Sequence, residues 1–92
     1  MNVENPGEGS VQRGLWRLML KLPSLRGELQ IRLPRSESLK NLCEAYDEAA
    51  AVLQNLRTDS RSGVQIKEYE AICEEIESDV IEYLVNETSV RK

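Results

Sequence analysis

The sequence has no histidine, no phenylalanine and only two cysteines among its 92 residues. Without histidine, the chain lacks a common general base and the usual partner of a serine or cysteine nucleophile. Two isolated cysteines do not make a zinc site, and the acidic residues lack the spacing of a calcium loop. We therefore expect a protein that is not an enzyme and that has no catalytic residue, no metal site and no cofactor.

Long apolar runs are missing as well. No stretch approaches the roughly 20 apolar residues that a membrane-spanning helix needs. Acidic residues near the N-terminus and basic residues within the apolar stretch 15–22 do not fit a secretory signal. Cys43 and Cys73 lie among apolar positions, where a free thiol behaves as a small hydrophobic group. These features predict a cytoplasmic protein with reduced cysteines.

The apolar residues that are present follow helical spacing in two stripes of matched length. The first stripe runs from Leu39 to Leu56 and the second from Ile66 to Leu84, with steps of three and four residues. A polar turn at 58–63 separates them, so the two stripes can face each other along their full length. The sequence thus predicts an all-α fold, with an antiparallel helical hairpin over about 37–57 and 64–85.

The segment before the hairpin is less regular. Residues 1–10 have almost nothing to bury and predict a disordered tail, after which helical spacing predicts a short amphipathic helix over about 11–22. Apolar and polar side chains alternate toward the end of 25–33, which is typical of a strand. We expect an extended connector there, or an edge strand that pairs with a second chain. The predicted organisation is a tail (1–10), a basic N-terminal arm (11–35), the hairpin (36–86) and a second tail (87–92).

Charge is divided unevenly between the two parts of the chain. Residues 1–35 carry six basic and three acidic residues, whereas residues 36–92 carry six basic and thirteen acidic residues. The basic arm fits packing against the acidic helix, an anionic membrane surface or an organelle transit segment. Nucleic acid is not expected as a partner, because the acidic body repels phosphates. The arm residues predicted to contact a partner or a membrane are Trp16, Arg13, Arg17 and Lys21.

The hairpin needs a third element to cover it. Two helices of this length bury too few apolar side chains to offset the loss of chain entropy. The candidates are the chain's own segment 11–33, a second copy of the chain and a helix of another protein. The partner-binding residues predicted on the hairpin are Leu42, Tyr46, Leu53, Tyr69, Ile76 and Val80.

A short set of residues in both predicted helices resembles a known type of protein. The set comprises Leu42-Cys43-Glu44-Ala45-Tyr46 and, after the turn, Glu68-Tyr69, Ile72, Glu75-Ile76 and Leu84. With these residues the chain is similar in outline to short, uncharacterised bacterial helical-hairpin proteins of the YdcH and SlyX type. The resemblance covers residues 36–86 and implies a small coiled-coil hairpin without a catalytic residue.

These observations lead to one functional hypothesis and two alternatives. We expect a non-enzymatic helical protein–protein interaction module that self-associates or binds another helical protein. The first alternative is a small acidic chaperone or adaptor that holds a basic partner through the acidic helix. The second is a peripheral membrane factor that binds through the N-terminal helix. A small-molecule substrate is not expected in any of the three.

Overall fold

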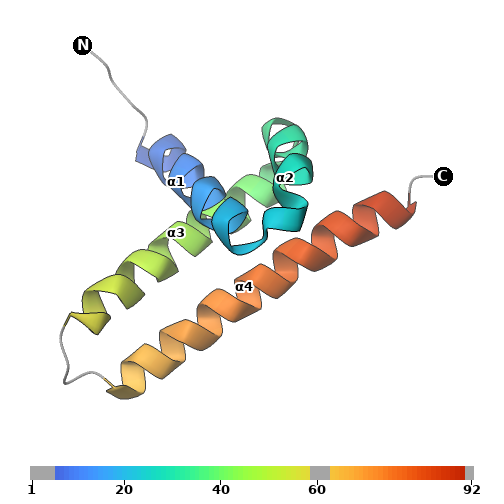
Figure 1. The fold of residues 1–92 in the computed structure, drawn as a ribbon. Helices are drawn as coiled ribbons and strands as arrows, with labels where there is room; N and C mark the ends of the chain where they lie inside the picture. Colours follow the sequence, from blue (N-terminus) through green and yellow to red (C-terminus); the bar gives the residue numbers. More distant parts are fainter. Residues whose placement is uncertain (1–5, 59–62, 91–92) are drawn as a thin grey trace, which may run out of the picture.

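A computed structural model describes residues 6–58 and 63–90, and this part of the chain is helical, without a β-strand (Figure 1). The all-α class is therefore confirmed. Residues 1–5, 59–62 and 91–92, which include most of the predicted turn, lie outside the described part. The elements are α1 (Pro6–Lys21), η1 (Pro23–Leu25), α2 (Arg26–Arg32), η2 (Leu33–Arg35), α3 (Glu37–Arg57) and α4 (Gly63–Val90).

Helix α3 begins and ends at residues with suitable capping groups. The Ser36 hydroxyl accepts a hydrogen bond from the Leu39 backbone N–H at 3.0 Å, which satisfies one of the free amides of the first turn. Glu37 adds a negative charge at the positive end of the helix dipole. At the other end, the Thr58 hydroxyl donates to the Asn55 carbonyl at 2.6 Å. These caps explain why α3 spans the predicted range.

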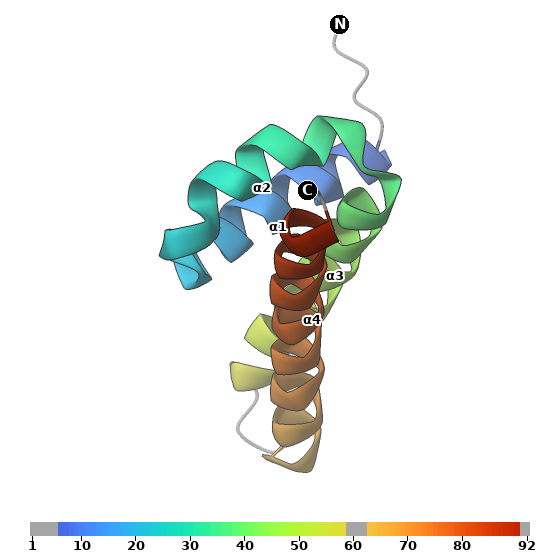
Figure 2. The ribbon, with the colours of Figure 1, turned by 90° about the vertical axis from the view of Figure 1, so that its right-hand side faces the viewer.

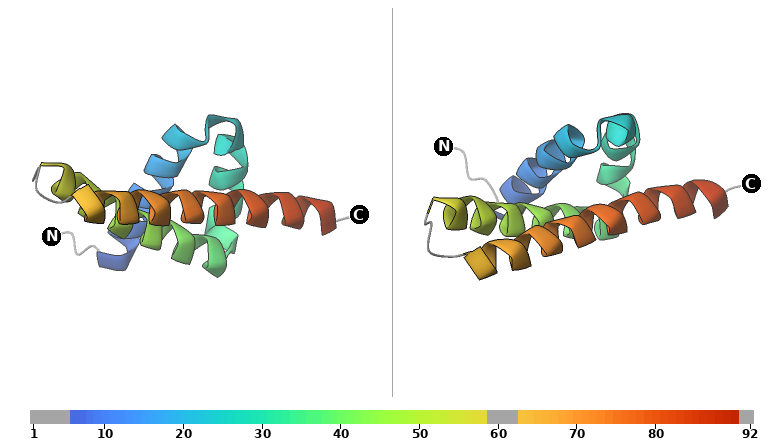
Figure 3. Two further views of the ribbon diagram at one scale, coloured as in Figure 1. Left: turned by 90° about the horizontal axis from the view of Figure 1, so that it is seen from below. Right: turned by 60° about the horizontal axis from the view of Figure 1, so that its bottom comes forward.

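Helix α3 is the centre of the arrangement and contacts both α1 and α4. Helices α3 and α4 lie side by side and run in opposite directions, whereas α1 crosses α3 at an angle (Figures 1 and 3). In Figure 2, α1 and α2 lie together over the part of the α3 and α4 pair that is remote from Arg57 and Gly63. The N-terminal segment is therefore a packed layer of the fold.

The predicted extended connector is wrong, because the segment is helical through α2 and the two short 3-10 helices around it. The apolar alternation contains a helical pair that the strand interpretation overlooked: Leu29 and Leu33 are four residues apart, and both are buried. Ile31, which a half-buried strand would place on the same face, is 67% exposed. An ion pair one helical turn apart, Arg32 Nε to Glu28 Oε1 at 2.7 Å, also supports the helix.

Both outer helices are longer than predicted. Helix α1 begins at Pro6 rather than at 11. Proline is well tolerated in the first turn of a helix, because the backbone N–H groups there form no hydrogen bond within the helix. Helix α4 continues to Val90, past the predicted end at 85. Residues 6–10 and 87–90 are thus helical in the structure rather than parts of the two predicted tails.

One hydrophobic core joins all of these elements: its buried apolar residues come from α1, α2, η2, α3 and α4, and Leu25 of η1 packs against them. The cover that the sequence analysis required is thus supplied in part by the chain itself. Among the described residues, no helix combines the length and apolarity that crossing a membrane requires. The buried core residues are Leu15, Leu18, Leu29, Leu33, Leu39, Cys43, Tyr46, Ala49, Leu53, Cys73, Val80 and Leu84.

Candidate interaction surface on the N-terminal helix

The inner face of α1 meets α3 at a very close backbone contact. A Cβ atom placed on Gly14 would lie 1.8 Å from the Cys43 carbonyl oxygen and 2.6 Å from its carbonyl carbon. Only glycine allows the two helices to approach this closely. Leu15 and Leu18 flank the crossing and are buried, Leu18 completely. Gly14 therefore fixes where and how α1 crosses α3.

A buried carboxylate on α3 holds the same helix by charge. Asp47 is only 4% exposed, and its two carboxylate oxygens accept hydrogen bonds from Arg13 Nε at 3.3 Å and Arg17 Nε at 3.1 Å. The two arginines are one turn apart on α1, so a single carboxylate can form ion pairs with both. Asp47 was not predicted from the sequence as a site residue. Its position among the apolar residues Cys43, Tyr46 and Ala50 was the available signal that this acid would be buried and paired.

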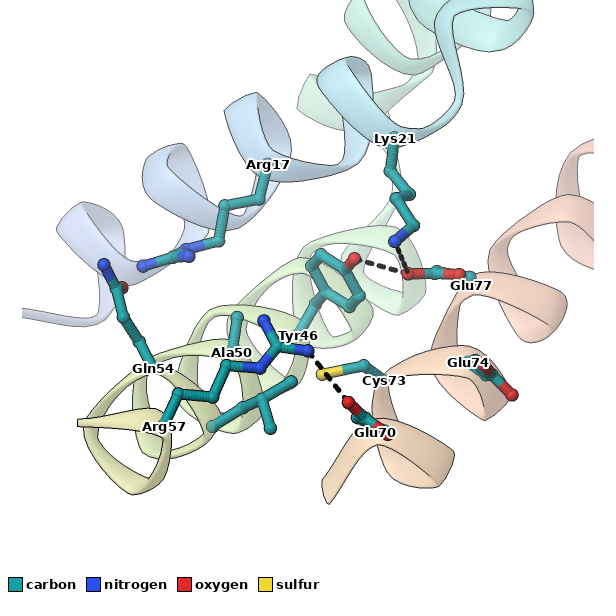
Figure 4. A pocket seen from close by; sticks show the side chains of 11 residues that line it. Arg17, Lys21, Tyr46, Ala50, Gln54, Arg57, Glu70, Cys73, Glu74 and Glu77 are labelled. Carbon is teal, nitrogen blue, oxygen red and sulfur yellow. Dashed lines mark hydrogen bonds and ion pairs between the residues drawn. The ribbon is translucent and has the colours of Figure 1, made fainter. Parts of the chain in front are cut away.

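A second polar cluster ties α1 and α3 to α4. The Tyr46 hydroxyl donates a hydrogen bond to Glu77 Oε2 at 2.6 Å, and Lys21 Nζ lies 3.8 Å from the same oxygen (Figure 4). Burial, followed by the hydrogen bond to Glu77, raises the pKa of Tyr46 above its ordinary value, so the hydroxyl stays protonated and able to donate. Lys21 is therefore paired with the acidic helix.

The charged groove beside this cluster has a volume of about 520 Å³ and lies between α1, α3 and α4. Figure 4 shows Arg17 and Lys21 on its α1 side and Glu70, Cys73, Glu74 and Glu77 on its α4 side. Two ion pairs cross the groove, Lys21 to Glu77 at 3.8 Å and Arg57 Nη2 to Glu70 Oε2 at 3.0 Å. Ion pairs across the groove thus connect the helices that form it.

The two cysteines are free and buried, and their environment suppresses the thiolate form. Burial raises the pKa of the Cys43 thiol from 9.0 to about 11. The pKa of Cys73 is also raised, mainly by burial and then by the charge of Glu77. Both thiols are therefore protonated at neutral pH and poor nucleophiles. In the described ranges, no group of three or more acidic or cysteine side chains is arranged to hold a metal ion.

The outer face of α1 carries two large apolar side chains that the fold leaves open. Trp16 is 56% exposed and Leu20 is 79% exposed, and they are one turn apart on the helix. Arg13 and Lys21 are mostly exposed as well, but their charged groups pair with Asp47 on α3 and Glu77 on α4. We call Trp16 and Leu20 the α1 outer face. Trp16 was predicted from the sequence as a contact residue, but Leu20 was not. The signal for Leu20 was its position outside the apolar stripe of the helix, which predicts an exposed leucine.

The six predicted partner-binding residues of α3 and α4 lie in or against the core. Tyr46, Leu53 and Val80 are buried within the chain. Leu42, Tyr69 and Ile76 are half-buried and pack against the same core. The structure therefore brings all six together as internal packing, while Trp16 stays outside that cluster.

A shallow groove of about 530 Å³ lies between the first part of α3 and the last part of α4. Leu42 and Tyr83 are its half-buried members, and the Tyr83 hydroxyl is 2.6 Å from the Ser36 hydroxyl, with which it shares a hydrogen bond. We call it the back groove. Its lining residues are Ser38, Asn41, Leu42, Asp79, Glu82, Tyr83 and Asn86.

Comparison of the chain with protein-family models, with curated proteins and with solved structures finds no match. The similarity to the YdcH and SlyX type therefore stays an expectation from the sequence.

Proposed function

We propose that the chain is a non-enzymatic helical protein–protein interaction module. In this proposal α3 and α4 form an antiparallel hairpin, the amphipathic α1 covers one side of it, and the α1 outer face receives the partner. The single observation that carries the proposal is the exposure of Trp16 and Leu20 on a helix whose inner face is fixed to α3 at Gly14. Two buried free thiols agree with a cytoplasmic setting.

Anchoring of α1 makes its outer face suitable for binding. Burial of a large apolar side chain contributes about 1.5 to 3 kcal/mol, and tryptophan is enriched among the residues that dominate binding energy. Because Gly14, Leu18 and the Asp47 ion pairs already hold α1 in place, a partner does not have to order the helix when it binds. The predicted residues of α3 and α4 then act as the scaffold that presents α1.

A peripheral membrane factor is the second candidate, since an exposed tryptophan with basic neighbours also suits an anionic lipid surface. The charges of α1 and of the whole chain favour a protein partner over an anionic membrane. Arg13 and Arg17 share Asp47, Lys21 is paired with Glu77, and the chain has a formal net charge of −4. Little positive charge is therefore left on α1 to attract an anionic membrane.

Photocrosslinking tests the proposal. A photoreactive amino acid at position 20, in cells that express the chain, is expected to give discrete protein adducts because this position lies within the interface. The matched control places the same group at Asn55, an exposed position on α3 away from the α1 outer face. Addition of Trp16→Ala to the position-20 variant is expected to remove the adducts.

Two results contradict the proposed function. Identical protein adducts from positions 20 and 55 mean that the surface has no binding preference. Lipid adducts without protein adducts from position 20 favour the membrane candidate instead.

A further inference from the structure

One edge of α1 carries three cations, and each of them is paired with an acid of a neighbouring helix. Arg13, Arg17 and Lys21 are spaced by four residues, so they form a row along the helix. The two arginines share Asp47 on α3, and Lys21 reaches Glu77 on α4 (Figure 4). We call these three residues the cationic row. It marks the edge of α1 that is turned toward the acids of α3 and α4.

The apolar surface of α1 is wider than a single packed face. Leu18 and Leu20 are two residues apart, which corresponds to about 200° around an α-helix. Within residues 11–21, the other apolar side chains fall between these two around the helix, with Gln12 among them: Val11, Leu15, Trp16 and Met19. A helix that packs on a core needs an apolar stripe only a little more than about 100° wide. Hydrophobic contact alone therefore does not select which part of this surface is turned toward α3.

The fold buries one half of this apolar surface and leaves the other half in water. Leu15 and Leu18 are buried, whereas Trp16 is 56% and Leu20 79% exposed. Tryptophan has the largest apolar surface to bury, so the hydrophobic effect favours a roll of α1 that brings Trp16 against α3. The contact at Gly14 sets where the helices cross, but glycine has no side chain that resists rotation about the helix axis. Another interaction has to hold Trp16 outside.

The ion pairs of Asp47 resist this roll. Its side chain is only 6% exposed, and its two oxygens accept hydrogen bonds from different arginines, Arg13 Nε at 3.3 Å and Arg17 Nε at 3.1 Å. A roll that turns Trp16 toward α3 turns the cationic row out toward solvent by the same angle. The roll would break both hydrogen bonds, and a buried carboxylate without donors is costly. Buried ion pairs of this kind can select one arrangement of a fold even where they add little stability.

We infer that Asp47 is a positioning residue that sets the rotation of α1 and thereby keeps the α1 outer face turned to solvent. Of the rotations that the wide apolar surface permits, Asp47 selects the one in which Trp16 and Leu20 stay outside. The inference rests on the proposed function in one respect, since it names the residue that controls whether the binding face is presented.

The emission of Trp16, the single tryptophan of the chain, tests the inference in the Asp47→Asn variant. Asparagine has nearly the same size as aspartate but carries no charge, so the ion pairs are lost and α1 is expected to roll. The emission maximum should then shift to shorter wavelength, with the helical content by circular dichroism retained. Quenching by acrylamide, a neutral reagent, is expected to fall roughly twofold, because the indole ring, now 56% exposed, leaves the solvent.

Two matched variants separate positioning from a general loss of charge. Asp47→Glu keeps the carboxylate, and the side chains of Arg13 and Arg17 are 58% and 35% exposed and free to follow it. We expect this variant to keep the emission of the unaltered chain. Glu70→Gln also replaces an acid by its amide, but its ion pair with Arg57 joins α3 to α4 without α1. Its emission is expected to stay unchanged as well.

Arg13→Gln provides a second route that does not alter the buried position. The substitution removes one of the two ion pairs at a mostly exposed residue, so the chain is expected to fold. A smaller shift to shorter wavelength is the expected result, since Arg17 still holds Asp47. This variant decides the question if Asp47→Asn fails to fold.

Two outcomes overturn the inference. Unchanged emission in Asp47→Asn and Arg13→Gln would show that Gly14 and the buried leucines set the rotation by themselves. A shift to longer wavelength with stronger quenching and loss of helix would show that α1 detaches, so that Asp47 only stabilises the fold. Either result is compatible with photoadducts from position 20 of the unaltered chain, which the proposed function requires.

The same crosslinking experiment links the inference to the proposed function. In the Asp47→Asn background, adducts from position 20 are expected to be lost, because Trp16 has left the outer face. A blue shift together with this loss supports both statements. A blue shift without adducts from the unaltered chain supports the role of Asp47 and contradicts the proposed function.

Discussion

Gly14→Ala is expected to lower the free energy of unfolding by about 2 kcal/mol, although alanine is the better helix former by about 1 kcal/mol. The new methyl group would lie 1.8 Å from the Cys43 carbonyl oxygen, 2.6 Å from the carbonyl carbon and 3.1 Å from Cα. These are backbone atoms of α3, so no side-chain rotation can relieve the clash. Helix α1 must move away, and packing at Leu15 and Leu18 is lost with it. Urea unfolding followed by circular dichroism measures the change.

The control for this variant is Gly27→Ala in α2. A Cβ atom at Gly27 meets no atom within 4 Å, so the substitution keeps all contacts and gains helix propensity. We expect stability to be unchanged or to rise by up to about 1 kcal/mol. Equal stabilisation by both substitutions would show that α1 and α3 do not meet at Gly14.

Leu18→Ala is expected to cost about 2 to 5 kcal/mol, because Leu18 is completely buried and its loss leaves a cavity in the core. The total stability of a chain of 92 residues is roughly 5 to 14 kcal/mol. The variant therefore loses a large share of the stability, and its thermal unfolding midpoint falls by many degrees. Differential scanning calorimetry provides the measurement.

Leu20→Ala is the matched comparison, since it makes the same chemical change on the same helix two residues later. Leu20 is 79% exposed, so we expect stability to change by no more than about 0.5 kcal/mol. The change in helix propensity from leucine to alanine is the same in both variants, so it cancels when their free energies of unfolding are compared. Similar losses from both substitutions would contradict the assignment of one inner and one outer face to α1.

The features predicted well from the sequence depend on local patterns. The stripe from Leu39 to Leu56 identified α3, because helical periodicity can be read from residues three and four positions apart. Helix α2 was missed because a seven-residue helix offers only two turns, too few to separate helical from alternating patterns. Leu29 and Leu33, four residues apart, were the decisive pair.

The features of the site that were not predicted depend on distant residues. The role of Gly14 was not predicted, since only the approach of Cys43, far along the sequence, reveals why glycine is needed. Asp47 is buried, and it is paired with Arg13 and Arg17, more than two dozen residues earlier in the chain. A sequence indicates that such a residue is unusual, but its partners follow from how the helices cross.

Amide hydrogen exchange of the unaltered chain tests the central statement of this account, that α1 is a fixed layer of the fold and not a loose arm. If α1 is packed on α3 as described, the backbone amides around Leu18 open with nearly the same free energy as those around Cys43 in α3. Exchange of the α1 amides at the rate of an unstructured peptide, while α3 and α4 stay protected, would contradict it.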